Sequence, residues 1–304
     1  MSSRLIWFDG KVLPVEDAKV NVLSPTSQFG ANVFEGIRCY WNDEDNQLYA
    51  FRLQDHLNRL LRSVKLFRFE SKYSLDDLQN SFIEVVQANK YKEDIAVRQT
   101  IFLDGMGSWF ATGPTNMFIA PIPKARLNPD VSKGIRCCVS SWERINDNSL
   151  SPRVKVGANY INSRAAQLEA IQNNYDSSIF LNNQGKVSEG PGSCLFIIRN
   201  NTLITPPHTA SILESITRDT IIEIAINDLG LKFEERDIDR TELYIADEAF
   251  LCGSAIEISA IVNIDGYSIG NSEKGDITKK IHMFYLEIVS GKVEKYSSWL
   301  TKIY

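Results

Sequence analysis

The spacing of apolar residues along the chain predicts several amphipathic helices. Between residues 53 and 67, Leu53, Leu57, Leu60 and Val64 recur at the three- and four-residue intervals that place side chains on one face of a helix. Further helices are expected after the pair Ser74 and Asp77, which has the spacing of a capping box, and over residues 160–173, 217–229 and 277–290.

Short apolar runs bounded by Gly, Pro or polar residues predict strands between these helices. They cover residues 5–8, 20–23, 34–40, 95–103, 117–121, 135–142, 178–181 and 195–198. Residues 121–134 carry three prolines and little apolar periodicity, which is typical of a linker. We therefore expect an α/β or α+β protein with domains at 1–123 and 135–304 joined by an interdomain loop at 124–134.

Composition narrows the class of protein. The chain has 304 residues, of which 43% are hydrophobic and 23% charged, an ordinary globular balance. The net charge of −5 gives no footprint for nucleic acid or an anionic membrane, and no stretch approaches transmembrane length. The five cysteines form no CxxC pair, so reduced, buried thiols and a cytoplasmic location are expected.

Lys155 is the first candidate for covalent chemistry. It lies between Val154 and Val156 and just before Gly157, a context that favours partial burial. Burial favours the neutral amine, which is nucleophilic toward carbonyl groups. Taken alone, a lysine in such a stretch is more often a solvated strand residue.

Three further segments fit either a role in binding or catalysis or a purely structural role. Ser215, Ile216 and Thr217 begin a helix whose backbone N–H groups suit a phosphate, although taken alone they favour the plain interpretation, an N-cap by Ser215 or Thr217. Glu189 lies in a Gly/Pro-rich turn, where an exposed loop glutamate is the plain alternative. Ser254 follows Gly253 in a loop that either binds an anion or simply turns the chain.

Other chemistries are disfavoured. None of the histidines, His56, His208 and His282, has another ligand at metal spacing, so no metal site is expected. The sequence lacks GxGxxG, Walker A and GxSxG motifs, which disfavours dinucleotide, nucleoside triphosphate and serine-hydrolase chemistry.

Several motifs in chain order resemble one family across nearly the whole sequence. The chain is similar to bacterial branched-chain-amino-acid aminotransferases, of the class IV pyridoxal-phosphate-dependent family. The matching runs are Phe34-Glu35-Gly36-Ile37-Arg38, His56-Leu57-Asn58-Arg59, Ser140-Ser141-Trp142-Glu143-Arg144, Lys155-Val156-Gly157-Ala158-Asn159-Tyr160, Ser188-Glu189-Gly190, Ile216-Thr217-Arg218-Asp219 and Ala246-Asp247-Glu248-Ala249-Phe250.

The resemblance implies the fold-type IV architecture, with a small N-terminal α/β domain and a larger, β-barrel-like C-terminal domain. It implies pyridoxal 5′-phosphate (PLP) as cofactor, an amino acid and a 2-keto acid as substrates, and a homodimer or larger homo-oligomer whose active sites borrow loops from the neighbour. No nucleic-acid or membrane partner is implied.

Site roles are also implied by the resemblance. Lys155 bonds the cofactor covalently and carries protons between Cα of the substrate and C4′ of the cofactor. Glu189 faces the pyridine nitrogen and Tyr160 the phenolic oxygen. The expected phosphate ligands are Arg59, Ser215, Ile216, Thr217 and Ser254. The expected substrate contacts are Phe29, Phe34, Arg98, Lys124, Ser254 and Ala255.

The chain departs from the family pattern in the substrate-binding segments. The family's tyrosine two positions before Arg98 is Ala96, its Tyr-Gly is Phe29-Gly30, and an aromatic residue of its interdomain loop is Lys124. These changes predict an altered substrate pocket beside intact cofactor residues. Two alternatives on the same fold stay open: a lyase similar to aminodeoxychorismate lyases, and a transaminase for D-amino acids or (R)-amines.

Overall fold

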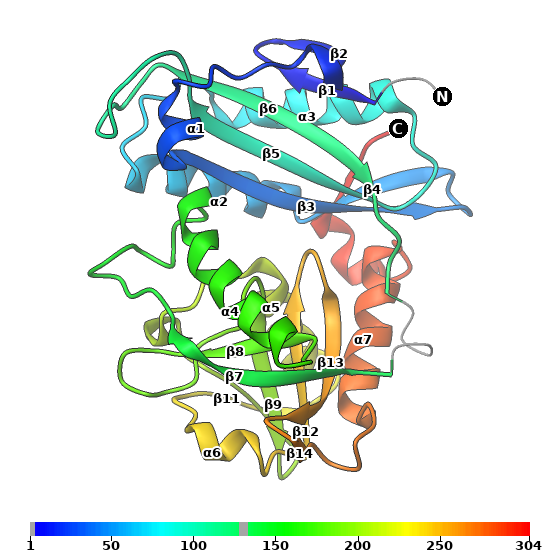
Figure 1. Cartoon of the computed structure of the whole chain (residues 1–304). Helices are drawn as coiled ribbons and strands as arrows, with labels where there is room; N and C mark the ends of the chain where they lie inside the picture. The colour runs from blue at the N-terminus through cyan, green and yellow to red at the C-terminus, as the bar shows by residue number, and fades with distance from the viewer. Residues whose placement is uncertain (1–3, 128–132) are drawn as a thin grey trace. The chain divides into compact units, whose positions relative to one another are not determined.

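The computed structural model describes residues 4–127 and 133–304. The chain forms two compact units, each with its own sheet (Figure 1). Unit 1 comprises Met1–Arg126, Val154–Ala158 and Glu287–Tyr304, and unit 2 comprises Leu127–Arg153 and Asn159–Leu286.

The sheet of unit 1 is antiparallel throughout, in the order β15-β4-β3-β5-β6-β1-β2. Its strands are β1 (Leu5–Phe8), β2 (Lys11–Pro14), β3 (Asn32–Asn42), β4 (Gln47–Phe51), β5 (Ile95–Leu103), β6 (Thr115–Pro123) and β15 (Leu300–Lys302). The last of these comes from the C-terminal end of the chain, so both ends of the sequence contribute to this sheet.

Helices α2 (Leu53–Leu66) and α3 (Leu75–Asn89) cover one face of this sheet. Their apolar residues, including Leu57, Leu60 and Phe82, pack with Val33 and Ile37 of β3 in one core. The capping box predicted for α3 is present, with Ser74 accepting a hydrogen bond from Asp77 N–H and Asp77 accepting one from Ser74 N–H. The remaining helical segments of unit 1 are α1 (Pro25–Phe29), η1 (Val15–Asp17) and η4 (Glu294–Trp299).

Unit 2 is built on a mixed sheet in the order β11-β10-β9-β12-β13-β7-β8, with β14 paired to β13. The pairs β7–β8, β7–β13 and β10–β11 are parallel. The strands are β7 (Ile135–Glu143), β8 (Ser177–Leu181), β9 (Cys194–Arg199), β10 (Thr202–Thr205), β11 (Lys232–Glu235), β12 (Glu248–Gly253), β13 (Glu257–Ile264) and β14 (Tyr267–Ser268). The helices are α4 (Tyr160–Gln172), α5 (Ile216–Asn227), α6 (Arg240–Leu243), α7 (Asp276–Val289), which runs on into unit 1, and the short η2 (Gly157–Asn159) and η3 (His208–Ala210).

The mixed α/β fold class is confirmed, and each predicted long helix lies within two residues of its expected bounds. One predicted strand is wrong. Residues 20–23 form a turn, and α1 follows, with Pro25 in its first turn and a side-chain cap from Ser24. The apolar residues Val22 and Leu23 are exposed here, so this short apolar run does not mark a strand that packs against the core.

The domain boundaries at 123 and 135 stay a prediction, and the compact units add two stretches to the first one. Residues 154–158 belong to unit 1 because Val33 and Val156 form an antiparallel bridge. Residues 287–304 belong to it because β15 extends its sheet. The Lys155 segment is therefore held by the N-terminal sheet.

All five cysteines are free and buried, as the sequence predicts. Within residues 4–127 and 133–304, no helix is long and apolar enough to cross a membrane.

We predict that Val156→Ala lowers the apparent free energy of unfolding by about 2 kcal/mol, because Val156 is fully buried and its lost methyl groups leave a cavity. Urea titration followed by circular dichroism measures the change. Val15→Ala is the control, since Val15 is 44% exposed and should change stability by less than about 0.5 kcal/mol. Equal effects of the two variants would show that residues 154–158 are not part of the core.

Candidate active site

Lys155 is fixed by its backbone on two sides in unit 1. The N–H of Phe34 donates to the Lys155 carbonyl at 2.9 Å, and the N–H of Lys155 donates to Ser63 Oγ at 3.3 Å. Val154 and Val156 on either side are buried, whereas Lys155 is only partly buried. The ammonium group lies 5.0 Å from the centre of the Phe34 ring. This arrangement holds the main chain of the lysine segment and places the ammonium group beside the Phe34 ring.

Gly157 is required by a close approach next to this lysine. A Cβ atom at Gly157 would lie 2.6 Å from Asn32 Oδ1, shorter than any real contact of this kind. The Asn32 amide in turn donates to Thr26 Oγ1 of α1 at 3.1 Å. The glycine of the Lys-Val-Gly run therefore lets the lysine segment pack closely against the start of β3.

Arg59 is buried beside an acidic partner that the sequence analysis did not single out. Its Nε donates to Glu35 Oε1 at 2.8 Å and its Nη2 to Glu35 Oε2 at 2.7 Å. His56 Nδ1 lies 2.7 Å from the same Oε2, and an ionised carboxylate only accepts, so His56 is the donor. Glu35 is fully buried, and both α2 residues point at it from one helical turn.

The charge states of this cluster follow from its geometry. Burial alone raises the pKa of Glu35, but the charge and hydrogen bonds of Arg59, with the hydrogen bond of His56, outweigh it and hold that pKa well below its ordinary value. Burial lowers the pKa of His56, partly opposed by Glu35. Glu35 is thus ionised and paired with Arg59, while His56 is neutral at neutral pH.

The predicted substrate residues Phe34, on the other face of β3, and Arg98, on the neighbouring strand β5, lie together. In the register of β3 and β5, Gly36 lies directly opposite Arg98 and Phe34 opposite Thr100. Because Gly36 has no side chain, the Arg98 guanidinium can lie over the Phe34 ring, 4.1 Å from its centre. Phe34 therefore contacts both Arg98 and Lys155, and unit 1 brings these three predicted residues together.

Two other predicted substrate residues occupy exposed positions in unit 1. Phe29 ends α1 and is 49% exposed. Lys124 follows β6, and its side chain is exposed while its N–H donates to the Asp94 carbonyl. The substrate role of each stays a prediction.

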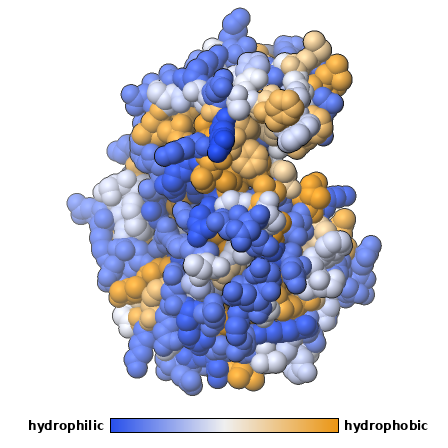
Figure 2. Space-filling view, turned by 90° about the vertical axis from the view of Figure 1, so that its left-hand side faces the viewer, coloured by the Kyte–Doolittle hydropathy of each residue, from blue (hydrophilic) through white to orange (hydrophobic). Residues whose placement is uncertain are grey.

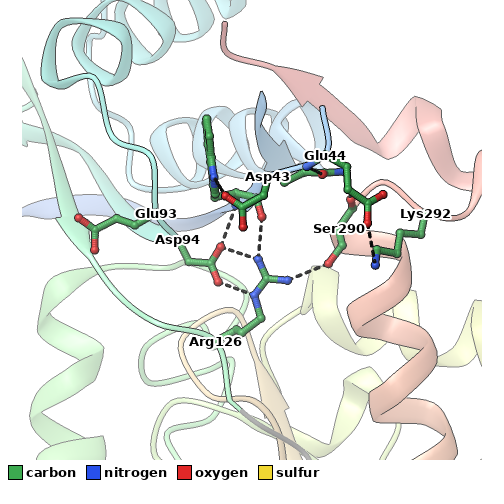
Figure 3. A pocket seen from close by; sticks show the side chains of 9 residues that line it. Asp43, Glu44, Glu93, Asp94, Arg126, Ser290 and Lys292 are labelled. Atoms are coloured by element: carbon green, nitrogen blue, oxygen red, sulfur yellow. Dashed lines mark hydrogen bonds and ion pairs between the residues drawn. The ribbon is translucent and has the colours of Figure 1, made fainter. Parts of the chain in front are cut away.

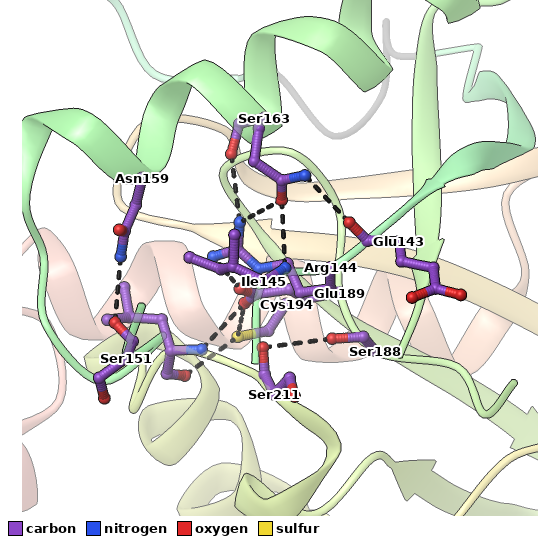
Figure 4. Close-up of polar contacts among 12 residues, drawn as sticks. Glu143, Arg144, Ile145, Ser151, Asn159, Ser163, Ser188, Glu189, Cys194 and Ser211 are labelled. Carbon is purple, nitrogen blue, oxygen red and sulfur yellow. Dashed lines mark hydrogen bonds and ion pairs between the residues drawn. The ribbon is translucent and has the colours of Figure 1, made fainter. Parts of the chain in front are cut away.

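Unit 2 holds Glu189 in a buried polar cluster (Figure 4). Arg144 Nη2 lies 2.8 Å from Glu189 Oε1. On the other oxygen, the N–H of Leu213 donates at 3.2 Å, and the Cys194 thiol donates over 3.8 Å. The exposed-loop alternative for Glu189 is therefore wrong, because the side chain is only 3% exposed.

The predicted phosphate residues lie at the start of α5. Ser215 is the N-cap and accepts a hydrogen bond from the N–H of Arg218, so the capping interpretation of Ser215 is confirmed. Ile216 and Thr217 are buried in the first turn. Arg218 is also buried and donates to the Pro206 carbonyl at 3.1 Å, which ties the helix start to the preceding loop. Backbone N–H groups and the helix dipole make such a start attractive to a phosphate.

The other predicted residues of unit 2 lie at chain turns. Ser254 and Ala255 form the turn between β12 and β13, with Ser254 partly buried and Ala255 exposed. Tyr160 is the first residue of α4 and is partly buried. Within residues 4–127 and 133–304, no group of three or more His, Cys, Asp or Glu side chains is placed to hold a metal ion.

A polar cleft of about 440 Å³ in unit 1 is lined by none of the predicted residues (Figure 3). Arg126 is its main cation. The Arg126 guanidinium pairs with both oxygens of Asp94, at 2.5 and 2.6 Å, and donates to Ser290 Oγ at 2.8 Å. This hydrogen bond connects the segment after β6, which contains Arg126, with the residue that follows α7, Ser290. We see a structural role for this cleft.

The sequence analysis did not predict Glu35 and Arg144 as site residues, although each forms an ion pair with a predicted site residue. Both belong to motifs that the sequence analysis quoted, the Phe-Glu-Gly and Ser-Ser-Trp-Glu-Arg runs. The available signal was a charged residue inside an otherwise apolar strand or at its end, where an unpaired charge is costly. Neither partner is close in sequence, so spacing could not reveal the pair.

Comparison with known proteins identifies the family. Residues 32–264 match the family described as amino-transferase class IV. The chain is 40% identical over 98% of its length to a probable branched-chain-amino-acid aminotransferase of Aquifex aeolicus, covering 96% of that protein. It is 37% identical over 98% of its length to the branched-chain-amino-acid aminotransferase of Escherichia coli K12, covering 97%.

Solved structures agree with the sequence comparison. A branched-chain aminotransferase from Thermoproteus uzoniensis, crystallised with norvaline, has a TM-score of 0.94 at 43% identity, with 100% of each chain covered. One from Thermobaculum terrenum, in the PLP form, has a TM-score of 0.94 at 41% identity, with 99% of each chain covered. The chain belongs to the class IV aminotransferase family and is an aminotransferase, which confirms the family prediction.

We predict that Glu35→Gln lowers the free energy of unfolding by about 3–5 kcal/mol at pH 7, because Arg59 is left with an uncompensated buried charge. Because folding lowers the pKa of Glu35, its ionised carboxylate stabilises the folded protein at pH values above 4.5, the ordinary pKa of this group. This stabilisation is lost progressively as the pH falls below 4.5. The difference in free energy of unfolding between wild type and variant, measured by urea titration, should therefore become smaller below pH 4.5.

Glu93→Gln is the matched control, since Glu93 is exposed, and it should change stability by less than about 0.5 kcal/mol. A gap between wild type and Glu35→Gln that is the same at every pH would contradict the assigned ionisation of Glu35.

Proposed function

We propose that this protein is a PLP-dependent aminotransferase that moves an amino group between a branched-chain L-amino acid and a 2-keto acid. The observation that carries the proposal is the anchored lysine: the backbone of Lys155 is hydrogen-bonded to Phe34, and its ammonium group lies beside the Phe34 ring. The relatives described above are all branched-chain enzymes, and one of them was crystallised in the PLP form.

The residues of both units fit this cofactor chemically. Unit 1 offers an amine for its aldehyde and a buried arginine at position 59. Unit 2 offers a carboxylate at position 189, a phenol at position 160 and a helix start at 216–217 with the turn at Ser254. When bound, PLP supplies an electron sink for the bond that breaks at Cα of the substrate. We assign the lysine, carboxylate, phenol and phosphate roles to these residues as part of the proposal.

Each residue then has one physical task. Lys155 would bond the aldehyde carbon of the cofactor with loss of water, and once the amine of the substrate displaces it, the freed lysine amine would move a proton from Cα of the substrate to C4′ of the cofactor. Glu189 holds a proton on the pyridine nitrogen, because an ionised carboxylate stabilises a positive ring. Arg59, the N-terminal turn of α5 and Ser254 bind the phosphate and orient the ring.

The substrate assignment rests on the residues around Phe34. The Phe34 ring with Arg98 over it offers an apolar surface beside a cation, which suits an amino acid with an apolar side chain and a carboxylate. Ala96, Phe29 and Lys124 depart from the family pattern and allow a bulkier or more polar keto acid. Ser254 and Ala255 are assigned to the substrate carboxylate through their backbone N–H groups.

Unit 1 also carries a surface that fits a second copy of the chain. Exposed apolar side chains gather on residues 22–29 and on the loop between β5 and β6, and Pro25 lies near Gly107 where the two segments meet. Apolar groups are visible among the polar surface of this side in Figure 2. The exposed side chains are Val22, Leu23, Phe29, Met106, Trp109 and Phe110. Patches of this kind mark interfaces, and we propose a homodimer that uses this one.

The alternatives are less well supported. The relatives described above are branched-chain transaminases, which favours group transfer over the lyase and over a D-amino acid or (R)-amine transaminase. A cytoplasmic location is proposed because all five thiols are free, as is usual in a reducing compartment.

We predict that Lys155→Ala abolishes covalent attachment of PLP and nearly all turnover, because it removes both the bonding amine and the proton carrier. Borohydride reduction of the wild-type protein with PLP, followed by peptide mapping, should label Lys155. Lys232→Ala, an exposed lysine of β11, is the control and should keep full labelling. A label on any other lysine would refute the assignment.

We further predict that competition kinetics rank the keto acids of leucine, isoleucine and valine as good acceptors. Lys124→Ala separates the two forms of the substrate proposal. If Lys124 meets a polar or anionic group of a larger substrate, the variant should lose about 1–3 kcal/mol in kcat/KM for that substrate only. If the branched-chain keto acids win and Lys124→Ala changes nothing, the altered-pocket part of the proposal is wrong and the plain branched-chain assignment stands.

A further inference from the structure

The carboxylate of Glu189 is held on both oxygens by donors from three separate segments of unit 2 (Figure 4). Arg144, directly after β7, pairs with Oε1 at 2.8 Å. Leu213 in the segment before α5 and Cys194 at the start of β9 donate to Oε2. Rotation of the carboxylate would break at least one of these contacts, so its plane is fixed.

Arg144 is itself held in place. Its side chain is 7% exposed, and its Nη1 lies 3.4 Å from both Asn162 Oδ1 and Ser163 Oγ of α4. The guanidinium carbon lies 5.6 Å from the centre of the Phe180 ring. A rigid, doubly anchored arginine loses little conformational entropy when it binds a carboxylate.

Burial sets what this pair can do. Glu189 is 3% exposed, and a buried charge is costly unless a cation or several donors pair with it. Arg144 supplies that cation directly to Oε1.

We propose that Arg144 is a positioning residue for the cofactor's pyridine nitrogen and acts only through Glu189. Its contact with Oε1 fixes the orientation of the carboxylate, so that the carboxylate would be held in place to accept a hydrogen bond from the ring nitrogen. The inference rests on the proposed function, in which Glu189 faces that nitrogen. Arg144 has no contact with the cofactor or the substrate in this proposal.

The test compares two cofactors bound by the apo-protein: PLP and an analogue in which the ring nitrogen is replaced by a C–H group. The ratio of their dissociation constants isolates the contact at the nitrogen, since the phosphate and aldehyde ends are the same. Wild type should prefer PLP by about 10- to 100-fold, the range for a hydrogen bond to a charged group. Glu189→Gln should remove most of this preference.

Arg144→Met should reduce the preference to the level of Glu189→Gln, and the double variant should lose no more, because both changes remove one interaction. Arg144→Lys keeps the charge without the planar fork, so it should recover part of the preference. Arg199 of β9 is the control, because it is also ion-paired but with Glu242 instead of Glu189, and Arg199→Met should keep the wild-type ratio. Melting temperatures of the apo-proteins report any loss of folding separately.

Three results would overturn the inference or its basis. No preference in wild type would refute the proposed contact of Glu189 with the ring nitrogen. A preference that Glu189→Gln removes and Arg144→Met keeps would refute the role of Arg144 alone. Equal weakening of both cofactors in Arg144→Met and Arg144→Lys, with a lower melting temperature, would make Arg144 a structural residue.

Discussion

A buried carboxylate is costly unless a cation or several donors pair with it, and Glu35 in unit 1 and Glu189 in unit 2 are each paired with an arginine. In unit 1, Glu35 is bound by both nitrogens of the Arg59 fork, and in unit 2 Glu189 is bound by Arg144. Removing one partner would leave the other as an uncompensated buried charge, so each pair fixes the position of both of its members. The groups proposed to hold the two ends of the cofactor are the same groups that these pairs make rigid.

The alternation of side chains along β3 links the core to the chemistry. Val33, Glu35 and Ile37 face the helices, so one face of the strand supplies apolar packing and the buried acid. Phe34 faces the other way, where it meets Arg98 of the neighbouring strand and the amine of Lys155. A shift of one residue in register would exchange these two faces and separate Lys155 from Phe34. The strand register therefore matters as much to the site as the identity of its residues.

Sequence alone was sufficient for local structure and for the type of chemistry. The expected helices α2, α3, α4, α5 and α7 are present, and in α2, α3 and α7 the apolar residues keep the helical period that packing on one face leaves in the sequence. The motifs around Lys155 and Glu189 carried the family, and the comparisons bear this out. The signal failed at residues 20–23, where apolar side chains are exposed and form no core face.

Tertiary structure decided which distant residues meet. Only the fold places Glu35 beside Arg59 and Arg144 beside Glu189, since each pair is brought together by packing between elements far apart in sequence. Only the fold shows that residues 154–158 and the C-terminal strand join the N-terminal sheet. Strand pairing is made by backbone hydrogen bonds, which every residue except proline can form, so the side chains do not reveal which strands pair. The sequence by itself determined the local elements and the reactive groups, and long-range packing determined their partners.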